Sequence, residues 1–286
     1  MTDIFSRRSA DSGFSLVEVS VVLVIVGLLL AGLLLPLGAQ IEQQNMNETN
    51  RRLEMAREAL LGFAISNRRM PCPASLTSSG VETTPSAVSP GLGTCSNALS
   101  GYVPAVTLGL QPIDSGTRLF LDAWGNPIRY AVTDFAITFT STGGTTYTSL
   151  RPFTYTDGLR TVYNGHSNAL LALAPDLRVC AMYAGTTSTH VPILTSPSVL
   201  CGTTTTTEDN GLITNAVAVI FSTGKNTPTG GIALDEFANL NGDRAFASHS
   251  PIPAGTTLAG GEFDDMVLWL SPFSLYNRMI VGGALP

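Results

Sequence analysis

An uncharged apolar run near the N-terminus constrains this chain more than any other feature. Val19–Ile41 has no charged residue over 23 positions, and a polar leader with Arg7 and Arg8 precedes it. A helix needs about 20 apolar residues to cross the hydrocarbon core of a membrane. A cleaved secretory signal is shorter and ends in a small-residue cleavage site, which residues 36–40 fit poorly. The run therefore predicts a single-pass membrane helix, with the arginines cytoplasmic and the C-terminal body outside.

One carboxylate stands at the start of this run. Gly13, followed by Phe14-Ser15-Leu16-Val17-Glu18 and an apolar helix, closely resembles the cleavage and methylation motif of type IV prepilins. The resemblance implies that a prepilin peptidase cuts after Gly13 and methylates the new amine of Phe14. It also implies that Glu18 pairs with the terminal amine of a neighbouring subunit, because a buried carboxylate is tolerable only with a partner. The alternative is that Glu18 is an interfacial charge that reaches the headgroups.

A second pattern continues the helix beyond the apolar run. Leu53, Ala56 and Leu60, with Phe63 and Asn67, recur at spacings of three and four, which is the stripe of an amphipathic helix. Met70-Pro71-Cys72-Pro73 ends it, because proline cannot continue a helix. We expect a helix from about Phe14 to Asn67. The expected organisation is a leader (1–13), a transmembrane and assembly half of the helix (14–38), an amphipathic half (39–69) and a periplasmic β-rich head (70–286).

The head is predicted to be an antiparallel β-sheet with long loops, so the fold class is α+β, and the resemblance to type IV prepilins implies a pilin-like fold. Phe135, Ile137 and Phe139 alternate with small residues before Gly143-Gly144, which indicates a strand and a turn. Polar stretches such as Thr203–Thr207 and Thr227–Gly261 are expected to be surface loops. Further strands are predicted at Ala169–Leu173, Leu177–Tyr183, Ala216–Phe221 and Asp265–Leu270.

Two segments of the head resemble the major pseudopilins of type II secretion. The first is Asp122–Tyr130, in which we expect Trp124 to anchor the core and Gly125-Asn126-Pro127 to form a turn. The second comprises Ser222–Asn226 and Glu262–Trp269. In those proteins the loop before the last strand binds calcium, which here implies Asn226, Asp264 and Asp265, beside Glu262, as Ca²⁺ ligands. Asn226 stands where an acidic residue is usual, and a solvated strand edge is the alternative interpretation.

A second acidic group lies between these two parts. It could also bind a cation, although its spacing matches no EF-hand loop. Its members are Asp235, Glu236, Asn239, Asn241 and Asp243.

The four cysteines are widely spaced and form no zinc-binding pattern. Nearness in sequence favours the disulfides Cys72–Cys95 and Cys180–Cys201 among three possible connectivities. Disulfides would imply an oxidising compartment such as the periplasm.

The composition argues against several functions. A formal net charge of −6 makes nucleic acid an unlikely partner, since a binder of phosphates needs a basic face. His166, His190 and His249 are isolated, and no catalytic motif is present, so we expect no enzymatic activity.

Three functions remain in competition. The first is a structural subunit of a type IV pilus or type II secretion pseudopilus, with the prepilin peptidase, other subunits, the inner membrane and the assembly platform protein as partners. The second is a minor tip pilin that binds a substrate, a surface or DNA. The third is a membrane-anchored protein that never polymerises, which the motif at Gly13, Phe14 and Glu18 disfavours.

Overall fold

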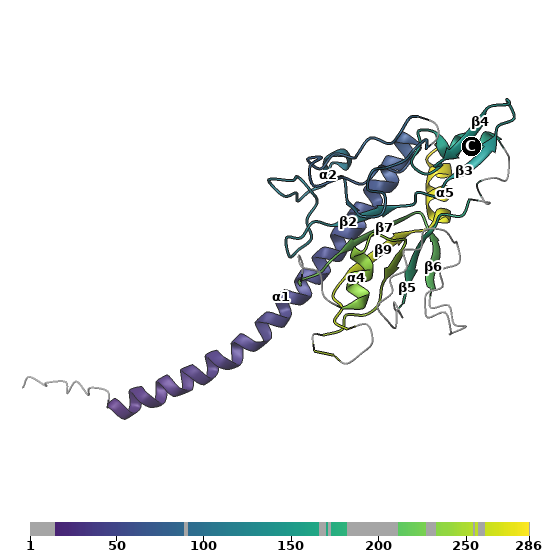
Figure 1. Cartoon of the computed structure of the whole chain (residues 1–286). Helices are drawn as coiled ribbons and strands as arrows, with labels where there is room; N and C mark the ends of the chain where they lie inside the picture. Colours follow the sequence, from purple (N-terminus) through teal and green to yellow (C-terminus); the bar gives the residue numbers. More distant parts are fainter. Residues whose placement is uncertain are drawn as a thin grey trace, which may run out of the picture. The chain divides into compact units, whose positions relative to one another are not determined.

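The computed structural model describes residues 15–88, 91–165, 170, 173–181, 211–226, 233–253, 255–256 and 261–285. The side chains of residues 30–37, 165 and 234 are not described. The chain divides into two compact units, Met1–Met46 and Asn47–Pro286. Helix α1 (Leu16–Asn67) begins in the first unit and ends in the second (Figure 1).

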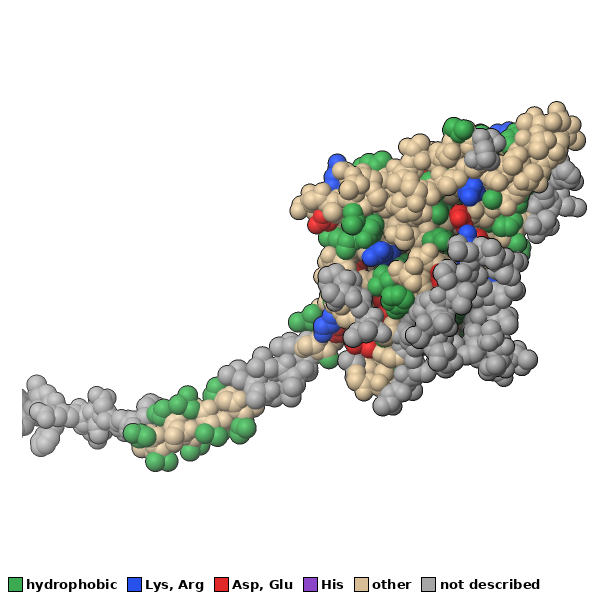
Figure 2. Space-filling view, in the orientation of Figure 1, with side chains coloured by type: hydrophobic (Ala, Val, Ile, Leu, Met, Phe, Trp, Pro, Cys, Tyr) green, Lys and Arg blue, Asp and Glu red, His purple; other side chains and the backbone are tan. Residues whose placement is uncertain are grey.

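The start of α1 exposes many hydrophobic side chains. Hydrophobic side chains such as Leu16, Leu23 and Leu28 are exposed along the described part of this stretch, where Figure 2 shows them in green. Among the helices formed by described residues, none is both long and apolar enough to cross a membrane.

The second unit opens with the amphipathic part of α1. Leu53, Ala56 and Leu60 are buried as predicted, but Phe63 is half-buried and Asn67 is exposed. The stripe instead continues through Ala64, which keeps the spacing of four. The helix ends at Asn67, as predicted, because Arg68 adopts the left-handed conformation with φ of 54°.

The central sheet has four strands in the order β1-β2-β7-β9. Its neighbours are antiparallel, and alternate residues face opposite sides. Tyr130 and Ile220 join the buried cluster that contains the α1 stripe, whereas Ala131 and Val219 face a second cluster. The strands are β1 (Gly101–Tyr102), β2 (Arg129–Val132), β7 (Ala218–Ser222) and β9 (Met266–Leu270).

A second sheet, in the order β6-β5-β8, covers the other face. It comprises β6 (Gly211–Ala216), β5 (Leu177–Cys180) and β8 (Ala245–Ala247). Strands β5 and β8 run parallel, so the predicted antiparallel pattern is wrong for this pair. The prediction of loops across Thr227–Gly261 is also wrong in part, because this range contains α4 (Leu234–Leu240) and the buried strand β8. The chain between β5 and β8 contains β6, β7 and α4, which together supply the long connection that parallel strands require.

A separate hairpin and three short helices complete the head. The predicted strand and turn form the hairpin of β3 (Ile137–Thr140) and β4 (Thr146–Leu150), in which Phe139 stacks on Tyr147. Helix α5 (Pro272–Val281) lies beside α1, since Arg278 pairs with Glu58 at 3.1 Å. The remaining helices are α2 (Ala105–Leu108) and α3 (Gly158–Gly165).

The other strand predictions have mixed outcomes. The last strand is confirmed as β9, and β5 occupies the start of Leu177–Tyr183. Ala216–Phe221 is not one strand, because the chain breaks at Val217 between β6 and β7. Within Ala169–Leu173, the described residues Leu170 and Leu173 are not in a strand, and the others lie outside the described residues. Thr203–Thr207 also lies outside them.

Candidate functional site

The N-terminal site is described from Ser15 onward, so Gly13 and Phe14 lie outside the described residues. Glu18 occupies the first turn of α1. The Ser15 amide donates to Glu18 Oε2 at 3.0 Å, and the Glu18 amide donates to Ser15 Oγ at 3.2 Å. These reciprocal bonds form a capping box, which satisfies two amides that a helix start leaves without partners. A carboxylate in the first turn is also favoured by the helix dipole.

A second candidate site is an acidic cluster in the head. One carboxylate oxygen from each of Glu236, Asp264 and Asp265 lies within 4.8 Å of the others. Glu236 comes from α4, whereas the two aspartates immediately precede β9. Glu236 is 1% exposed and Asp265 is 5% exposed. Three carboxylates held this closely, two of them buried, repel one another strongly unless protons or a cation reduce their charge.

The protein supplies only part of the hydrogen bonds that these carboxylates can accept. Glu236 Oε1 accepts from the Asn226 side-chain amide at 2.9 Å and from the Asp264 backbone amide at 3.2 Å. Asp265 accepts from Asn239 at 2.7 Å. Glu236 Oε2 and Asp264 Oδ1 are buried, and no residue that the structure describes donates a hydrogen bond to either. Carboxylate oxygens without hydrogen bonds, gathered in one cluster, are ligands of the kind that a hard cation binds.

Burial raises the pKa of all three carboxyls. The pKa of Glu236 rises because of burial, and the charge of Asp264 adds to the effect. Burial also raises the pKa of Asp264. It raises the pKa of Asp265 well above its usual range, and the negative charges of Glu236 and Asp264 add to this rise. The cluster therefore resists ionisation without a positive partner.

The loop after β7 wraps around Asp264. The amides of Lys225 and Asn226 both donate to Asp264 Oδ2, at 2.9 and 3.2 Å. Gly224 has φ of 63°, and a Cβ at this position would collide with the Asp264 carboxylate. Glycine is thus needed both for the left-handed conformation and for the close approach.

The structure regroups the predicted cation ligands. Asp264 and Asp265 lie together as the sequence analysis expected, while the Asn226 side chain donates to Glu236. Glu236, assigned to the second acidic group, belongs to the first. Sequence reasoning missed this because 28 residues separate Glu236 from Asp264.

The rest of the second acidic group is dispersed among other contacts. Asp235 Oδ2 lies 3.0 Å from His249 Nε2, and the His249 ring stacks on Phe263. Asn241 and Asp243 bond to each other in the turn before β8. The described part of the group therefore forms no separate cation site. His166 and His190 lie outside the described residues.

The turn at Asp122 connects this loop to α1, because the Ala123 amide donates to Thr49 Oγ1 at 3.1 Å. Asp122 accepts from the Asn126 amide at 2.8 Å and from Ser222 Oγ at 2.6 Å. The Asn126 side chain donates to the Gly224 carbonyl at 2.7 Å. Trp124 is only partly buried and lies outside the core cluster, so its predicted role as core anchor is wrong. Ile128 and Tyr130, both fully buried, fill the core at the end of this turn.

Comparison with known proteins adds one finding, at the N-terminus. Residues 8–34 match the family model of the prokaryotic N-terminal methylation motif. The match supports a type IV prepilin- or pseudopilin-type protein. It implies processing by prepilin peptidase and assembly with other pilin-type subunits. No curated protein and no solved structure shows significant similarity to the chain.

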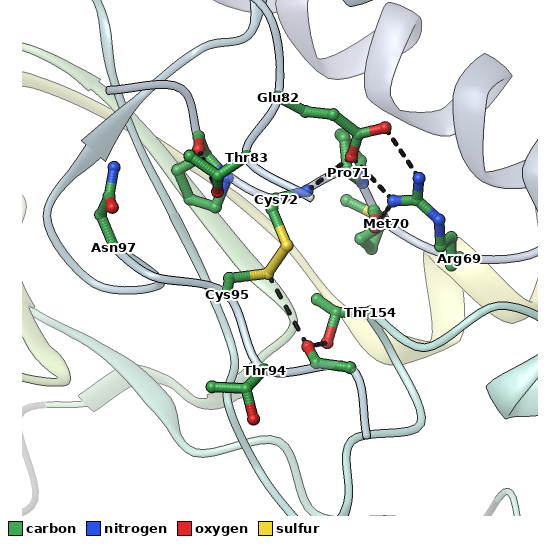
Figure 3. The surroundings of a disulfide bond; sticks show 12 residues. Arg69, Met70, Pro71, Cys72, Glu82, Thr83, Thr94, Cys95, Asn97 and Thr154 are labelled. Atoms are coloured by element: carbon green, nitrogen blue, oxygen red, sulfur yellow. Dashed lines mark hydrogen bonds and ion pairs between the residues drawn. A yellow bond between two sulfur atoms is a disulfide. The ribbon is translucent and has the colours of Figure 1, made fainter. Parts of the chain in front are cut away.

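The head contains a disulfide between Cys72 and Cys95, as predicted (Figure 3). Their Cα atoms are 5.5 Å apart and the residues are 23 positions apart in sequence. Beside the bond, Arg69 pairs with Glu82 at 2.7 Å, and Glu82 also accepts from the Cys72 amide at 3.1 Å. Cys180 is disulfide-bonded, and Cys201, its predicted partner, lies outside the described residues.

Proposed function

We propose that this protein is a structural subunit of a type IV pilus or a type II secretion pseudopilus. The observation that carries the proposal is the methylation motif at residues 8–34, which runs directly into a helix with Glu18 in its first turn. Prepilin peptidase cuts between Gly13 and Phe14 and methylates the Phe14 amine. Subunits then polymerise through their N-terminal helices, with Glu18 paired to the amine of an adjacent subunit.

The proposal includes a membrane stage before assembly. Val19–Ile41 carries no charge over 23 residues, and Arg7 and Arg8 precede it, so the subunit passes the inner membrane once with its head in the periplasm. The Cys72–Cys95 disulfide fits that oxidising compartment. The assembly platform protein of the same membrane is the partner that extracts the subunit into the filament. The α+β head, whose buried core includes Leu53, Ala56 and Leu60 of α1, suits a structural role.

Processing is tested by sequencing the N-terminus of the mature protein. We expect it to begin at N-methylated Phe14, because the peptidase recognises the polar leader and the apolar start of the helix. A mature protein that begins after Ala39 would mean that the apolar run is an ordinary signal peptide.

Assembly is tested with Glu18→Ala, compared with wild type in the membrane and in sheared filaments. We expect normal insertion and cleavage, because the substitution makes the helix more apolar and leaves the cleavage site intact. Incorporation into filaments should fall strongly, since the Phe14 amine of the neighbouring subunit loses its partner in an apolar environment. Glu18→Asp should also incorporate poorly because its reach is shorter. Equal incorporation of Glu18→Ala and wild type would contradict the proposal.

We further propose that the acidic cluster binds Ca²⁺. Glu236, Asp264 and Asp265 would hold the ion, with Asn226 beside it, and the support is the pair of buried oxygens to which no described residue donates a hydrogen bond. Ca²⁺ favours such all-oxygen sites and tolerates irregular geometry. The bound ion would neutralise the cluster and fix the loop after β7 against β9.

Calcium binding is tested by thermal unfolding of the purified protein in EDTA and in Ca²⁺. We expect Ca²⁺ to raise the Tm of wild type, because a ligand of the folded state stabilises it. Glu236→Gln should lose this shift. Glu54→Gln, which changes an exposed carboxylate on α1, is the matched control and should keep it. An identical Tm shift in wild type and Glu236→Gln would contradict a site at this cluster.

A further inference from the structure

We infer that the β3–β4 hairpin is a docking surface for a second copy of this chain: the outer edge of β4 in one copy pairs with the outer edge of β3 in the next. The inference rests on the proposed function, since a filament brings copies of the head together in one orientation. It goes beyond that function by placing a contact between copies in the head, at a hairpin that is not part of α1.

The hydrogen bonds of the hairpin show which backbone groups face outward. The Ser141 amide donates to the Thr145 carbonyl at 2.9 Å, so these residues form a hydrogen-bonded pair. Bonded and non-bonded pairs alternate along antiparallel strands. Thr140 and Thr146, the next pair, are therefore not bonded through their backbones, and their hydroxyls lie 3.0 Å apart instead. The backbone N–H and C=O groups of both residues consequently point to the outer edges, as do those of Thr138, two positions before Thr140.

Both outer edges are open in the part of the chain that the structure describes, because β3 and β4 form a two-stranded sheet by themselves. Figure 1 shows the two strands at the periphery of the head. The one register shift adds a residue to β4 between Tyr147 and Leu150, so the half of the hairpin beside the turn is regular. Natural proteins usually block open edges with charges or proline, but residues 135–150 contain neither. The hairpin therefore presents two edges that can accept a further strand.

The charge of the chain favours a second copy as the partner. The formal net charge is −6, so copies repel one another, but no charged residue opposes contact at residues 135–150. Phe139 and Tyr147 pack against the core, whereas Thr138, Thr140 and Thr146 are exposed. A charged peptide finds no opposite charge on this segment. A second uncharged hairpin offers matching backbone groups and the same threonine side chains.

The common orientation of filament subunits determines which edges meet. Strands β3 and β4 run antiparallel within one hairpin. When the next copy has the same orientation, its β3 lies beside the first copy's β4 and runs antiparallel to it, so the sheet continues from copy to copy. Each contact leaves one β3 edge and one β4 edge free at the two ends. A head-to-tail contact of this kind can repeat without closing, as a filament requires.

The test uses the full chain in two co-expressed copies that carry different tags. One copy carries Thr138→Cys on β3 and the other carries Thr146→Cys on β4, and a short bismaleimide joins neighbouring thiols in sheared filaments. No described native cysteine is free to react. We expect cross-linked pairs that contain one copy of each tag. Two tagged copies that both carry Thr138→Cys should not cross-link to each other, because two β3 edges do not meet.

A proline on the β3 edge tests the backbone pairing. Thr140→Pro, in the copy that carries Thr138→Cys, removes an outward N–H, and an edge strand tolerates proline at such a position. Cross-linking should fall about fivefold, the factor that corresponds to one lost hydrogen bond. Thr142→Pro is the matched control: the Gly144 amide donates to the Ser141 carbonyl, and proline is favoured at the second position of such a turn. If Thr140→Pro lowers the Tm of the purified protein, the cysteine pair alone decides.

Filaments that contain both tagged copies without a cross-linked pair would overturn this inference and leave the proposed function intact. Equal cross-linking with Thr140→Pro and Thr142→Pro, at an unchanged Tm, would also overturn it. Efficient cross-linking between two copies of Thr138→Cys would do the same, because it would indicate a two-fold contact between β3 edges. Cross-links to a different polypeptide instead would assign the edge to another partner and reject a second copy. Absence of both copies from sheared filaments would overturn the proposed function, and this inference with it.

Discussion

Asp122 shows how one buried carboxylate can organise the contact between two segments. Its Oδ1 accepts from the Trp124 amide at 2.9 Å and the Asn126 amide at 2.8 Å, and its Oδ2 accepts from Ser222. Burial raises the pKa of Asp122, while these hydrogen bonds oppose the rise. The side chain thereby joins the turn before β2 to the end of β7.

Replacing this carboxylate should be costly. Asp122→Ala leaves the amides of Trp124 and Asn126 and the hydroxyl of Ser222 without their acceptor, and each unsatisfied buried donor costs about 1–3 kcal/mol. We expect the free energy of unfolding to fall by at least about 2 kcal/mol in urea titrations of the purified protein. Asp114→Ala is the control, since Asp114 caps an exposed turn. Equal losses in the two variants would contradict this role for Asp122.

Glu48 gives a pH-dependent prediction at the same scale. Hydrogen bonds from Arg51 and Arg52 lower its pKa to about 2. A carboxyl whose pKa is lower in the folded state stabilises the fold above its unfolded pKa, and this contribution is lost as the pH falls toward about 2. The carboxyl resonance of Glu48 in an NMR titration should shift at a pH well below that of an unperturbed glutamate. An ordinary glutamate pKa for Glu48 would contradict the two ion pairs.

At the scale of elements, the sequence predicted the long helix α1, whose apolar residues recur with a helical period. The spacing of Leu53, Ala56 and Leu60 located the buried face of α1, and Arg68 and Pro71 explain why the helix ends where it was expected to end. Strand β8 was missed because Ala-Phe-Ala is too short to show alternation, and it is buried by its parallel contact with β5. Its burial is set by distant strands, which local patterns do not report.

The docking of α1 on the head gives a prediction for this element. Thr49 is fully buried, and its hydroxyl accepts from the Ala123 amide at 3.1 Å. Thr49→Val keeps the shape but leaves that amide without a partner, so we expect a loss of about 1–3 kcal/mol in unfolding free energy. Urea unfolding followed by tryptophan fluorescence measures it. Thr49→Ser, which keeps the hydroxyl, should lose clearly less; a similar loss in both would indicate that methyl packing, not the hydrogen bond, matters.

At the scale of the whole molecule, the candidate cation site shows where sequence reasoning stops. Asp264 and Asp265 were identified as candidate Ca²⁺ ligands because they lie before the last strand, where the resemblance to major pseudopilins implies such ligands. Glu236 was placed in another group, since nothing in the sequence shows that α4 returns to the start of β9. Only the three-dimensional arrangement brings its carboxylate to the two aspartates.

The Cys72–Cys95 disulfide gives a prediction at this same scale, because it stabilises the protein mainly by lowering the conformational entropy of the whole unfolded chain. It closes a loop between residues 23 apart, directly after the end of α1. Loop-closure entropy for such a span corresponds to a stabilisation of about 3 kcal/mol. We therefore expect Cys72→Ala/Cys95→Ala to lower the unfolding free energy by roughly that amount.

The denaturant dependence separates this effect from lost packing. Both cysteines are buried, so the double variant also removes contacts in the folded head. Lost contacts lower the midpoint of urea unfolding but leave the slope m unchanged, whereas an unfolded chain freed from its cross-link expands and exposes more surface, which raises m. We expect a lower midpoint together with a larger m. A lower midpoint with an unchanged m would assign the stabilisation to core packing around the two sulfurs instead of to the closed loop.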